Sequence, residues 1–221
     1  GIHDALLNWL RNFLFDRKQC VAVGKHISKP CNVISGVPQG SVLGPILFLL
    51  YIGDVVEIFD TTVSCKLFAD DVKIYSTIEN DATSCQLTQA LKNLCEWSAK
   101  WQLTVNVDKC IVLHIGKNNP KLNYFINGFI IQSSDHVRDL GVEVDNLLKF
   151  DYQIENIVSR AYQRLAILFK GFISRDSKLL TKAYITYVRP ILEYCSSVWS
   201  PHYLKDIDAL EQVQRYFTRR L

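Results

Sequence analysis

Two neighbouring carboxylates, Asp70 and Asp71, are the residues of this chain with the most pronounced chemical character. They join two short runs of β-prone residues, 63–67 and 72–75, so the sequence predicts a tight hairpin with both aspartates at its tip. Adjacent like charges repel each other, and a divalent cation would relieve that repulsion. Because Mg²⁺ prefers carboxylate and phosphate oxygens, a phosphoryl-transfer site is one interpretation. A plain Asp-Asp turn is the other, and the residues alone favour it.

The segment 36–41, with the sequence Gly-Val-Pro-Gln-Gly-Ser, is a second candidate. Its Gly and Pro content predicts a loop, and glycine lets a ligand approach the backbone closely. Gln39 could hydrogen-bond a base or a sugar. Ser41 can cap the apolar helix that follows, and Pro45 suits its first turn. A glycine-rich loop alone is weak evidence, so a structural turn is the default interpretation.

Positive charge is concentrated in one stretch of the chain, although the formal net charge is only +3. Between residues 160 and 189, seven basic residues against one acid, Asp176, give a local charge of +6 on segments with helical periodicity. The basic residues are Arg160, Arg164, Lys170, Arg175, Lys178, Lys182 and Arg189. Such a surface predicts contact with nucleic-acid phosphates. A solvated helix face is the alternative, and charge alone leaves the two about even.

The first two thirds of the chain mix helical and extended patterns. Apolar spacing predicts the end of an amphipathic helix at 6–14 and a longer helix over 81–101, which Asp81 can cap. We expect a hairpin in which residues 20–23 pair with 31–34. Further along, strand character returns at 105–115 and again at 140–144, and Asn127-Gly128 predicts a hairpin with a type I′ turn.

From about residue 147 the pattern is helical. Periodic apolar residues predict helices over 154–168, 177–188 and 207–217, the first of them ending near Gly171. The fold class expected is therefore α+β, with a mixed region 1–146 followed by a helical region 147–221.

Composition sets broad limits on the kind of protein. With 221 residues and 48% apolar content, the chain can build a real hydrophobic core. The apolar run 42–52 is interrupted by Gly44 and Pro45 and is too short to span a bilayer. Seven cysteines without a Cys-x-x-Cys pair predict buried free thiols in a reducing, intracellular compartment. The chain has no Met and begins with Gly1, so we expect a piece of a longer protein.

Taken in order, these motifs resemble the reverse transcriptases of non-LTR retrotransposons, with the best fit to jockey and CR1-like elements. Residues 36–45 resemble the motif that follows the first catalytic strand of that family, and residues 68–71, Phe-Ala-Asp-Asp, resemble its aspartate pair. Residues 106–109 resemble the following motif, and Leu-Gly-Val at 140–142 with Asp145 resembles the primer grip. Arg-Pro-Ile-Leu-Glu-Tyr at 189–194, with Val-Trp at 198–199, resembles part of the thumb.

The resemblance implies a polymerase architecture. Residues 1–146 would be partial fingers and palm, an antiparallel sheet with packed helices, and residues 147–221 a helical thumb with the start of a connection. It also implies RNA-directed DNA polymerisation by two-metal nucleotidyl transfer, with Mg²⁺ or alternatively Mn²⁺. The partners would be an RNA template, a DNA primer and deoxynucleoside triphosphates, without a membrane, in the nucleus and cytoplasm.

Individual roles carry over by position. Asp70 would be a metal ligand, Asp71 its weaker companion, and Lys109 a proton donor near the triphosphate. The residues lining the nucleotide and template would be Pro38, Gln39, Gly40 and Ser41. The thumb residues on the nucleic acid would be Arg160, Arg164, Lys170, Lys178 and Lys182.

Two departures from the family pattern stand out. Gly53-Asp54 replaces the usual Asn-Asp, which puts the role of that position in doubt. The first metal-binding aspartate of the family lies upstream of the segment matched by residues 2–14, so we expect the chain alone not to polymerise DNA. The alternative function is a non-catalytic remnant that binds primer–template. A domesticated structural protein is less well supported, because Asp70, Asp71, Gln39 and Lys109 are all present.

Overall fold

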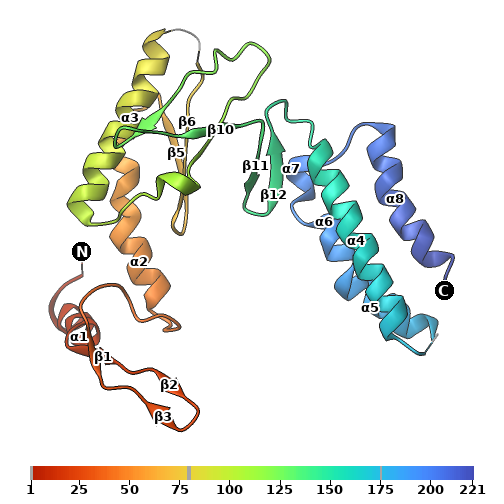
Figure 1. Cartoon of the computed structure of the whole chain (residues 1–221), viewed down its shortest axis with the longest axis horizontal. Helices are drawn as coiled ribbons and strands as arrows, with labels where there is room; N and C mark the ends of the chain where they lie inside the picture. Colours follow the sequence, from red (N-terminus) through yellow and green to blue (C-terminus); the bar gives the residue numbers. More distant parts are fainter. Residues whose placement is uncertain (1, 79–80, 175) are drawn as a thin grey trace. The chain divides into compact units, whose positions relative to one another are not determined.

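The computed structural model describes residues 2–78, 81–174 and 176–221, and shows an α+β chain (Figure 1). It divides into two compact units, Gly1–Val105 and Asn106–Leu221. The predicted cap on the helix at 81–101 and the predicted basic residue Arg175 cannot be assessed, because the Asp81 side chain and Arg175 lie outside the described residues. The expected functional boundary between residues 146 and 147 stays a prediction.

The first unit begins with an amphipathic helix and a β-ribbon and ends with a long helix. Its elements are α1 (Asp4–Leu14), β1 (Arg17–Gln19), β2 (Ala22–Val23), β3 (His26–Ile27), β4 (Cys31–Val33), α2 (Gly44–Ile52), the 3-10 helix η1 (Gly53–Ile58), β5 (Ser64–Phe68), β6 (Asp71–Tyr75) and α3 (Asp81–Trp101). The helices predicted at 6–14 and 81–101 and the hairpin around the aspartates are thus confirmed.

The hairpin predicted around residues 24–26 is confirmed, but its expected register is wrong. Strand β4 pairs with β1, and β2 pairs with β3 around a two-residue turn in which Gly24 is left-handed, with φ of +61°. A glycine in that conformation closes the inner hairpin tightly. Pro30 has no N–H to donate, and at this point the register shifts by one residue before the same ribbon continues as β4 paired with β1.

A small core fixes the hairpin β5–β6 in the first unit. Alternate residues of each strand turn inward, and among them Leu67 and Ile74 pack against the buried Ile52, Val55, Leu94 and Trp97. Asp54, the position left in doubt by the sequence, accepts a 2.9 Å hydrogen bond from the Trp97 indole. This bond ties η1 to α3, so Asp54 has a structural role.

The second unit places short strands before a set of packed helices. Its elements are η2 (Val107–Lys109), β7 (Ile111–Leu113), β8 (Phe125–Ile126), β9 (Phe129–Ile130), β10 (Gln132–Ser134), β11 (His136–Asp139), β12 (Val142–Asp145), α4 (Asp151–Gly171), α5 (Ser177–Tyr187), α6 (Arg189–Glu193), α7 (Ser196–Trp199) and α8 (Leu204–Thr218). Strands β8–β9 and β11–β12 are antiparallel hairpins, whereas β7 and β10 pair in parallel.

The predicted helices of the second unit are confirmed, and the core lies among them. The apolar stripe of α4, which includes Ala161 and Leu165, packs on Leu180 of α5 and on Val213 and Phe217 of α8. Two predicted strands are shorter than expected. Asn106 caps a 3-10 turn through the N–H of Asp108, so only residues 111–113 of the predicted strand 105–115 form a strand. In the predicted strand 140–144, Leu140 and Gly141 form a turn and the strand begins at Val142. The short α6 and α7 were not predicted.

The cysteines only partly follow expectation. All seven are free thiols as predicted, but none is buried: Cys20, Cys31 and Cys85 are exposed and the other four are half-buried. Cys20 lies between β1 and β2, Cys31 in the short strand β4, and Cys85 on an exposed face of α3.

Candidate active site

The aspartate pair lies at the end of the hairpin β5–β6. Phe68 pairs with Asp71 in the last rung, so the turn consists of Ala69 and Asp70 alone. Asp70 is therefore in the turn as predicted, while Asp71 is the first residue of β6 rather than part of the tip. Both side chains are exposed, and each is available to a ligand that approaches the end of the hairpin.

Ala69 has an unusual backbone conformation. Its φ is +52°, a left-handed value that glycine adopts freely and that costs an L-residue about 1–2 kcal/mol. A positive φ at the first turn position is the pattern of a type II′ turn, where Gly is the usual residue. Strain of this kind next to two carboxylates is typical of functional sites.

The donor set at this hairpin suits a magnesium ion that shares its coordination with a substrate. Among the described residues, no group of three or more His, Cys, Asp and Glu side chains could hold a metal. Mg²⁺ nevertheless binds proteins through one or two carboxylates and completes its shell with water and phosphate oxygens. Asp70 and Asp71 fit that requirement as a pair.

The predicted substrate loop is fixed at its helical end. The Ser41 hydroxyl donates to the Pro38 carbonyl at 2.7 Å and accepts from the Gly44 N–H at 3.0 Å. A Cβ atom at Gly44 would come within 2.9 Å of the Pro38 oxygen, so this close turn requires glycine there. Gln39 and the left-handed Gly40, with φ of +78°, form the exposed apex. Pro45 lies in the first turn of α2 as predicted, but the N-cap is Leu43 and not Ser41, which instead accepts the N–H of Gly44.

Arg17 fixes the other end of the loop, a role that no pattern in the sequence indicated. Its guanidinium donates to the carbonyls of Leu14 at 2.9 Å, Gly36 at 2.5 Å and Ser35 at 3.4 Å. The planar fork of an arginine can reach several carbonyls at once, which a lysine cannot reproduce. The loop is thus held from a strand that lies 19 residues earlier in the chain.

Lys109 lies in the second unit, at the end of η2, and its side chain is exposed. Its N–H donates to the carbonyl of Asn106 at 3.2 Å, so the capped turn fixes the backbone of this residue. The relation of Lys109 to the aspartate pair stays a prediction, because the aspartates belong to the first unit.

The predicted nucleic-acid residues lie on two helices of the second unit. Arg160 and Arg164 are exposed one turn apart on α4, and Lys170 is exposed in its last turn. Asp176, the one acid of this stretch, is used as the N-cap of α5, where it accepts from the Leu179 N–H at 2.7 Å. Its negative charge is therefore placed at the helix N-terminus, where the helix dipole favours it.

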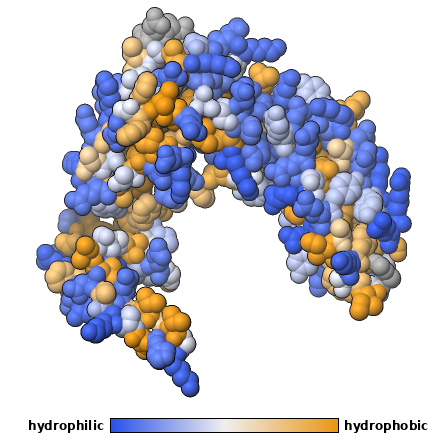
Figure 2. All heavy atoms as spheres, in the orientation of Figure 1, coloured by the Kyte–Doolittle hydropathy of each residue, from blue (hydrophilic) through white to orange (hydrophobic). Residues whose placement is uncertain are grey.

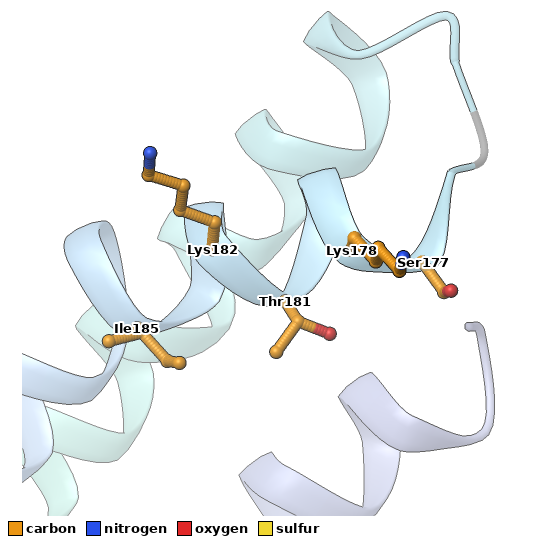
Figure 3. A pocket seen from close by; sticks show the side chains of 5 residues that line it. All are labelled: Ser177, Lys178, Thr181, Lys182 and Ile185. Carbon is orange, nitrogen blue, oxygen red and sulfur yellow. The ribbon is translucent and has the colours of Figure 1, made fainter.

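Lys178 and Lys182 lie one turn apart along a shallow groove on α5. The groove has a volume of about 400 Å³, and Figure 3 shows Lys182 extending away from Thr181 and Ile185. Ser177, Lys178, Thr181, Lys182 and Ile185 line it. A lining that combines hydroxyl, ammonium and methyl groups suits a sugar–phosphate backbone better than a compact apolar ligand.

Comparison with known proteins agrees with these features. Residues 2–144 match the family model described as reverse transcriptase (RNA-dependent DNA polymerase). The RNA-directed DNA polymerase from mobile element jockey of Drosophila melanogaster is 26% identical over 194 residues, which cover 84% of this chain and 21% of that protein. The probable RNA-directed DNA polymerase from transposon X-element of the same fly is 29% identical over 227 residues, covering 95% and 24%.

The chain thus spans about a quarter or less of the length of these curated relatives. No solved structure matches it. Within the described residues, no helix is both long and apolar enough to cross a membrane. The family model covers the substrate loop, the aspartate hairpin and Lys109, as the order of the motifs predicted. The chain therefore belongs to the reverse transcriptase family, in the group carried by non-LTR retrotransposons.

Proposed function

We propose that this chain is the part of an RNA-directed DNA polymerase that carries the catalytic aspartate pair, and that the polymerase works by two-metal nucleotidyl transfer. The observation that supports this most strongly is the strained two-residue turn of β5–β6, which exposes Asp70 and Asp71 together in a chain of the reverse transcriptase family. A turn built only for stability would have Gly or Asn in the left-handed position that Ala69 occupies.

In this proposal Asp70 is the main metal ligand and Asp71 its companion. Bound Mg²⁺, or Mn²⁺ in its place, would lower the pKa of the attacking hydroxyl and offset charge on the phosphate. Gln39 and Gly40 line the incoming nucleotide and the template, between Pro38 and Ser41. Lys109 donates a proton to the departing pyrophosphate.

The substrates proposed are an RNA template, a DNA primer and deoxynucleoside triphosphates, in the nucleus and cytoplasm. Residues 1–146 would be partial fingers and palm, and residues 147–221 the thumb with the start of a connection. The exposed cations on α4 and α5 would then hold the phosphates of the primer–template duplex. They are Arg160, Arg164, Lys170, Lys178 and Lys182.

We further propose that the 221-residue chain does not polymerise DNA by itself. Two neighbouring carboxylates from one hairpin are few ligands for two metal ions. In the family that the chain resembles, the first catalytic aspartate belongs to a motif upstream of the segment matched by residues 2–14. A non-catalytic primer–template binding remnant is the second candidate function. It is favoured by the basic faces of α4 and α5, which rest on a core of the second unit and not on the aspartate hairpin.

Primer extension on an RNA template with Mg²⁺ tests both candidates. The assay compares the chain with a form extended upstream through the first aspartate motif, each with Asp70→Ala and with Asp208→Ala, an exposed carboxylate of α8, as matched control. We expect extension only by the longer form, a loss of about a hundredfold or more with Asp70→Ala, and little change with Asp208→Ala. Extension by the 221-residue chain alone would disprove its proposed inactivity. A longer form that binds primer–template but never extends it would favour the remnant.

A further inference from the structure

The hairpin β11–β12 turns through an unusual pair of residues, Leu140 and Gly141. Both are left-handed, with φ of +45° and +89°, which is the pattern of a type I′ turn. The neighbouring hairpin β8–β9 makes the same kind of turn with Asn127 and Gly128, the residues that such a turn prefers. A leucine in that position strains the backbone, and its side chain is 43% exposed. Nothing in the folding of the hairpin requires it.

Tyr194 holds this strained turn in place. Its hydroxyl donates to the carbonyl of Leu140 at 3.0 Å, across 54 residues of sequence. Its ring lies against Gly141, since a Cβ atom built there would be 3.4 Å from the ring carbon Cε1. A side chain at Gly141 would reach van der Waals contact with the ring, and the positive φ would strain the backbone there.

Tyr194 is in turn fixed to the core of the second unit. The Trp199 indole donates to the Tyr194 carbonyl at 2.8 Å. Trp199 is only 2% exposed and belongs to the same buried cluster as Val142, the residue that follows the turn. The tip is thus connected to the core through its own strand and, separately, through Tyr194. The segments 140–142 and 189–199, two separate motifs in the sequence, form one physical element.

We propose that Tyr194 is a positioning residue for the segment that resembles the primer grip: it holds the Leu140–Gly141 tip so that the Leu140 side chain meets the sugar edge of the primer–template duplex. This inference rests on the proposed function and deepens it. Two contacts from Tyr194 hold the tip, and a strained, exposed apolar residue held in this way is better explained by a partner than by stability. The sugar edge offers apolar C–H groups between phosphates, which match an exposed leucine in the same unit as the basic helices.

Binding of an RNA template annealed to a labelled DNA primer tests the role of Tyr194 in the full chain. Tyr194→Phe keeps the ring against Gly141 and removes only the hydroxyl. We expect its affinity to fall by about three- to tenfold at a temperature where the variant is folded. Tyr187→Phe, at a 56% exposed tyrosine of α5, is the matched control and should change affinity less than about twofold.

A double-mutant cycle separates positioning from a general structural role. If Tyr194 acts through the tip, Tyr194→Phe and Leu140→Ala will weaken binding non-additively, whereas Tyr187→Phe and Leu140→Ala will add. Gly141→Ala, which keeps the tyrosine hydroxyl but displaces the tip, should weaken binding as Tyr194→Phe does.

Unchanged affinity of folded Tyr194→Phe, or additive effects with Leu140→Ala, would overturn the inference while leaving the proposed function standing. If the unmodified chain binds no primer–template at all, the proposed grip by the second unit fails, and this inference fails with it.

Discussion

The two compact units differ in how far they bury the apolar residues of their helices. In the first unit, α2 is apolar on all sides, and Ile46, Leu49 and Leu50 are 53%, 49% and 62% exposed. In the second unit, α4 has one apolar stripe, and its residues Ala161 and Leu165 are fully buried by neighbouring helices. Figure 2 shows further apolar surface on the hairpin β2–β3 of the first unit, where Val23 and Ile27 are exposed.

The contrast indicates that the units meet different demands. A helix that is apolar all round is stable only when other surfaces cover it, whereas an amphipathic helix needs cover on one side. The second unit supplies that cover from its own helices, so its stability is largely internal. The first unit positions the aspartate hairpin with a small core, and its remaining apolar surface is suited to contact with further protein. We expect low solubility of the isolated chain for this reason.

The largest effect expected from this comparison is a core truncation in the second unit. Leu165→Ala should lower the free energy of unfolding by about 2–5 kcal/mol, because it leaves a cavity among α4, α5 and α8. Ile46→Ala on α2 should change it by no more than about 0.5 kcal/mol, because that side chain is already half in solvent. Denaturant-induced unfolding, monitored by hydrogen exchange, measures the change in the free energy of unfolding of each variant. Equal losses for the two variants would refute the contrast between the units.

A smaller effect is expected at Asp145, which organises the entry into α4. Its carboxylate accepts from the Leu147 N–H at 2.9 Å and the Phe150 N–H at 2.6 Å. Burial raises the pKa of Asp145, but the backbone donors of Phe150, Lys149 and Leu147 outweigh it, so the pKa is lowered overall. Asp145→Asn should therefore cost about 1–3 kcal/mol at neutral pH.

The pH dependence of that cost follows from the sign of the shift. Because the folded pKa lies below the unfolded value, the stabilisation is complete above the unfolded pKa and is lost as pH falls through the folded pKa. The difference between the unmodified chain and Asp145→Asn should thus shrink in acid. Asp208→Asn, at an exposed position of α8, is the control and should show no such convergence. A difference that stays constant from neutral pH to pH about 2 would contradict the assigned role of the carboxylate.

The sequence predicts those features that depend on local chemistry. Asn127-Gly128 marks a type I′ turn wherever it occurs, and the alternation on either side of Asp70 is sufficient to define a hairpin. The apolar stripe of α4 could be recognised in the sequence because one face of the helix is buried along its whole length. The family could be recognised from the order of the motifs, although no single motif would have identified it.

Contacts between distant parts of the chain were not predictable in the same way. Neither the bond from Arg17 to Gly36 nor that from Tyr194 to Leu140 leaves a periodic trace, since each joins residues far apart in sequence. The register of the first ribbon shifts by one residue at Pro30, and this shift appears only when the two pairings are compared. The short α6 and α7 have too few residues to show a helical period.

The smallest effect on stability is expected at Ala69. It compares the turn of β5–β6 in the first unit with the turn of β8–β9 in the second. Ala69→Gly removes the left-handed strain of about 1–2 kcal/mol but adds freedom to the unfolded chain, so the net stabilisation should be no more than about 1 kcal/mol. Asn127→Gly in the second unit should gain less, because Asn tolerates this conformation. Local hydrogen exchange of β5–β6 and β8–β9 measures both changes. If Ala69→Gly also weakens metal-dependent extension in the longer polymerase, the strain serves to hold Asp70 in place. If it instead destabilises the hairpin, the turn is not strained, and the argument from Ala69 to a functional site fails.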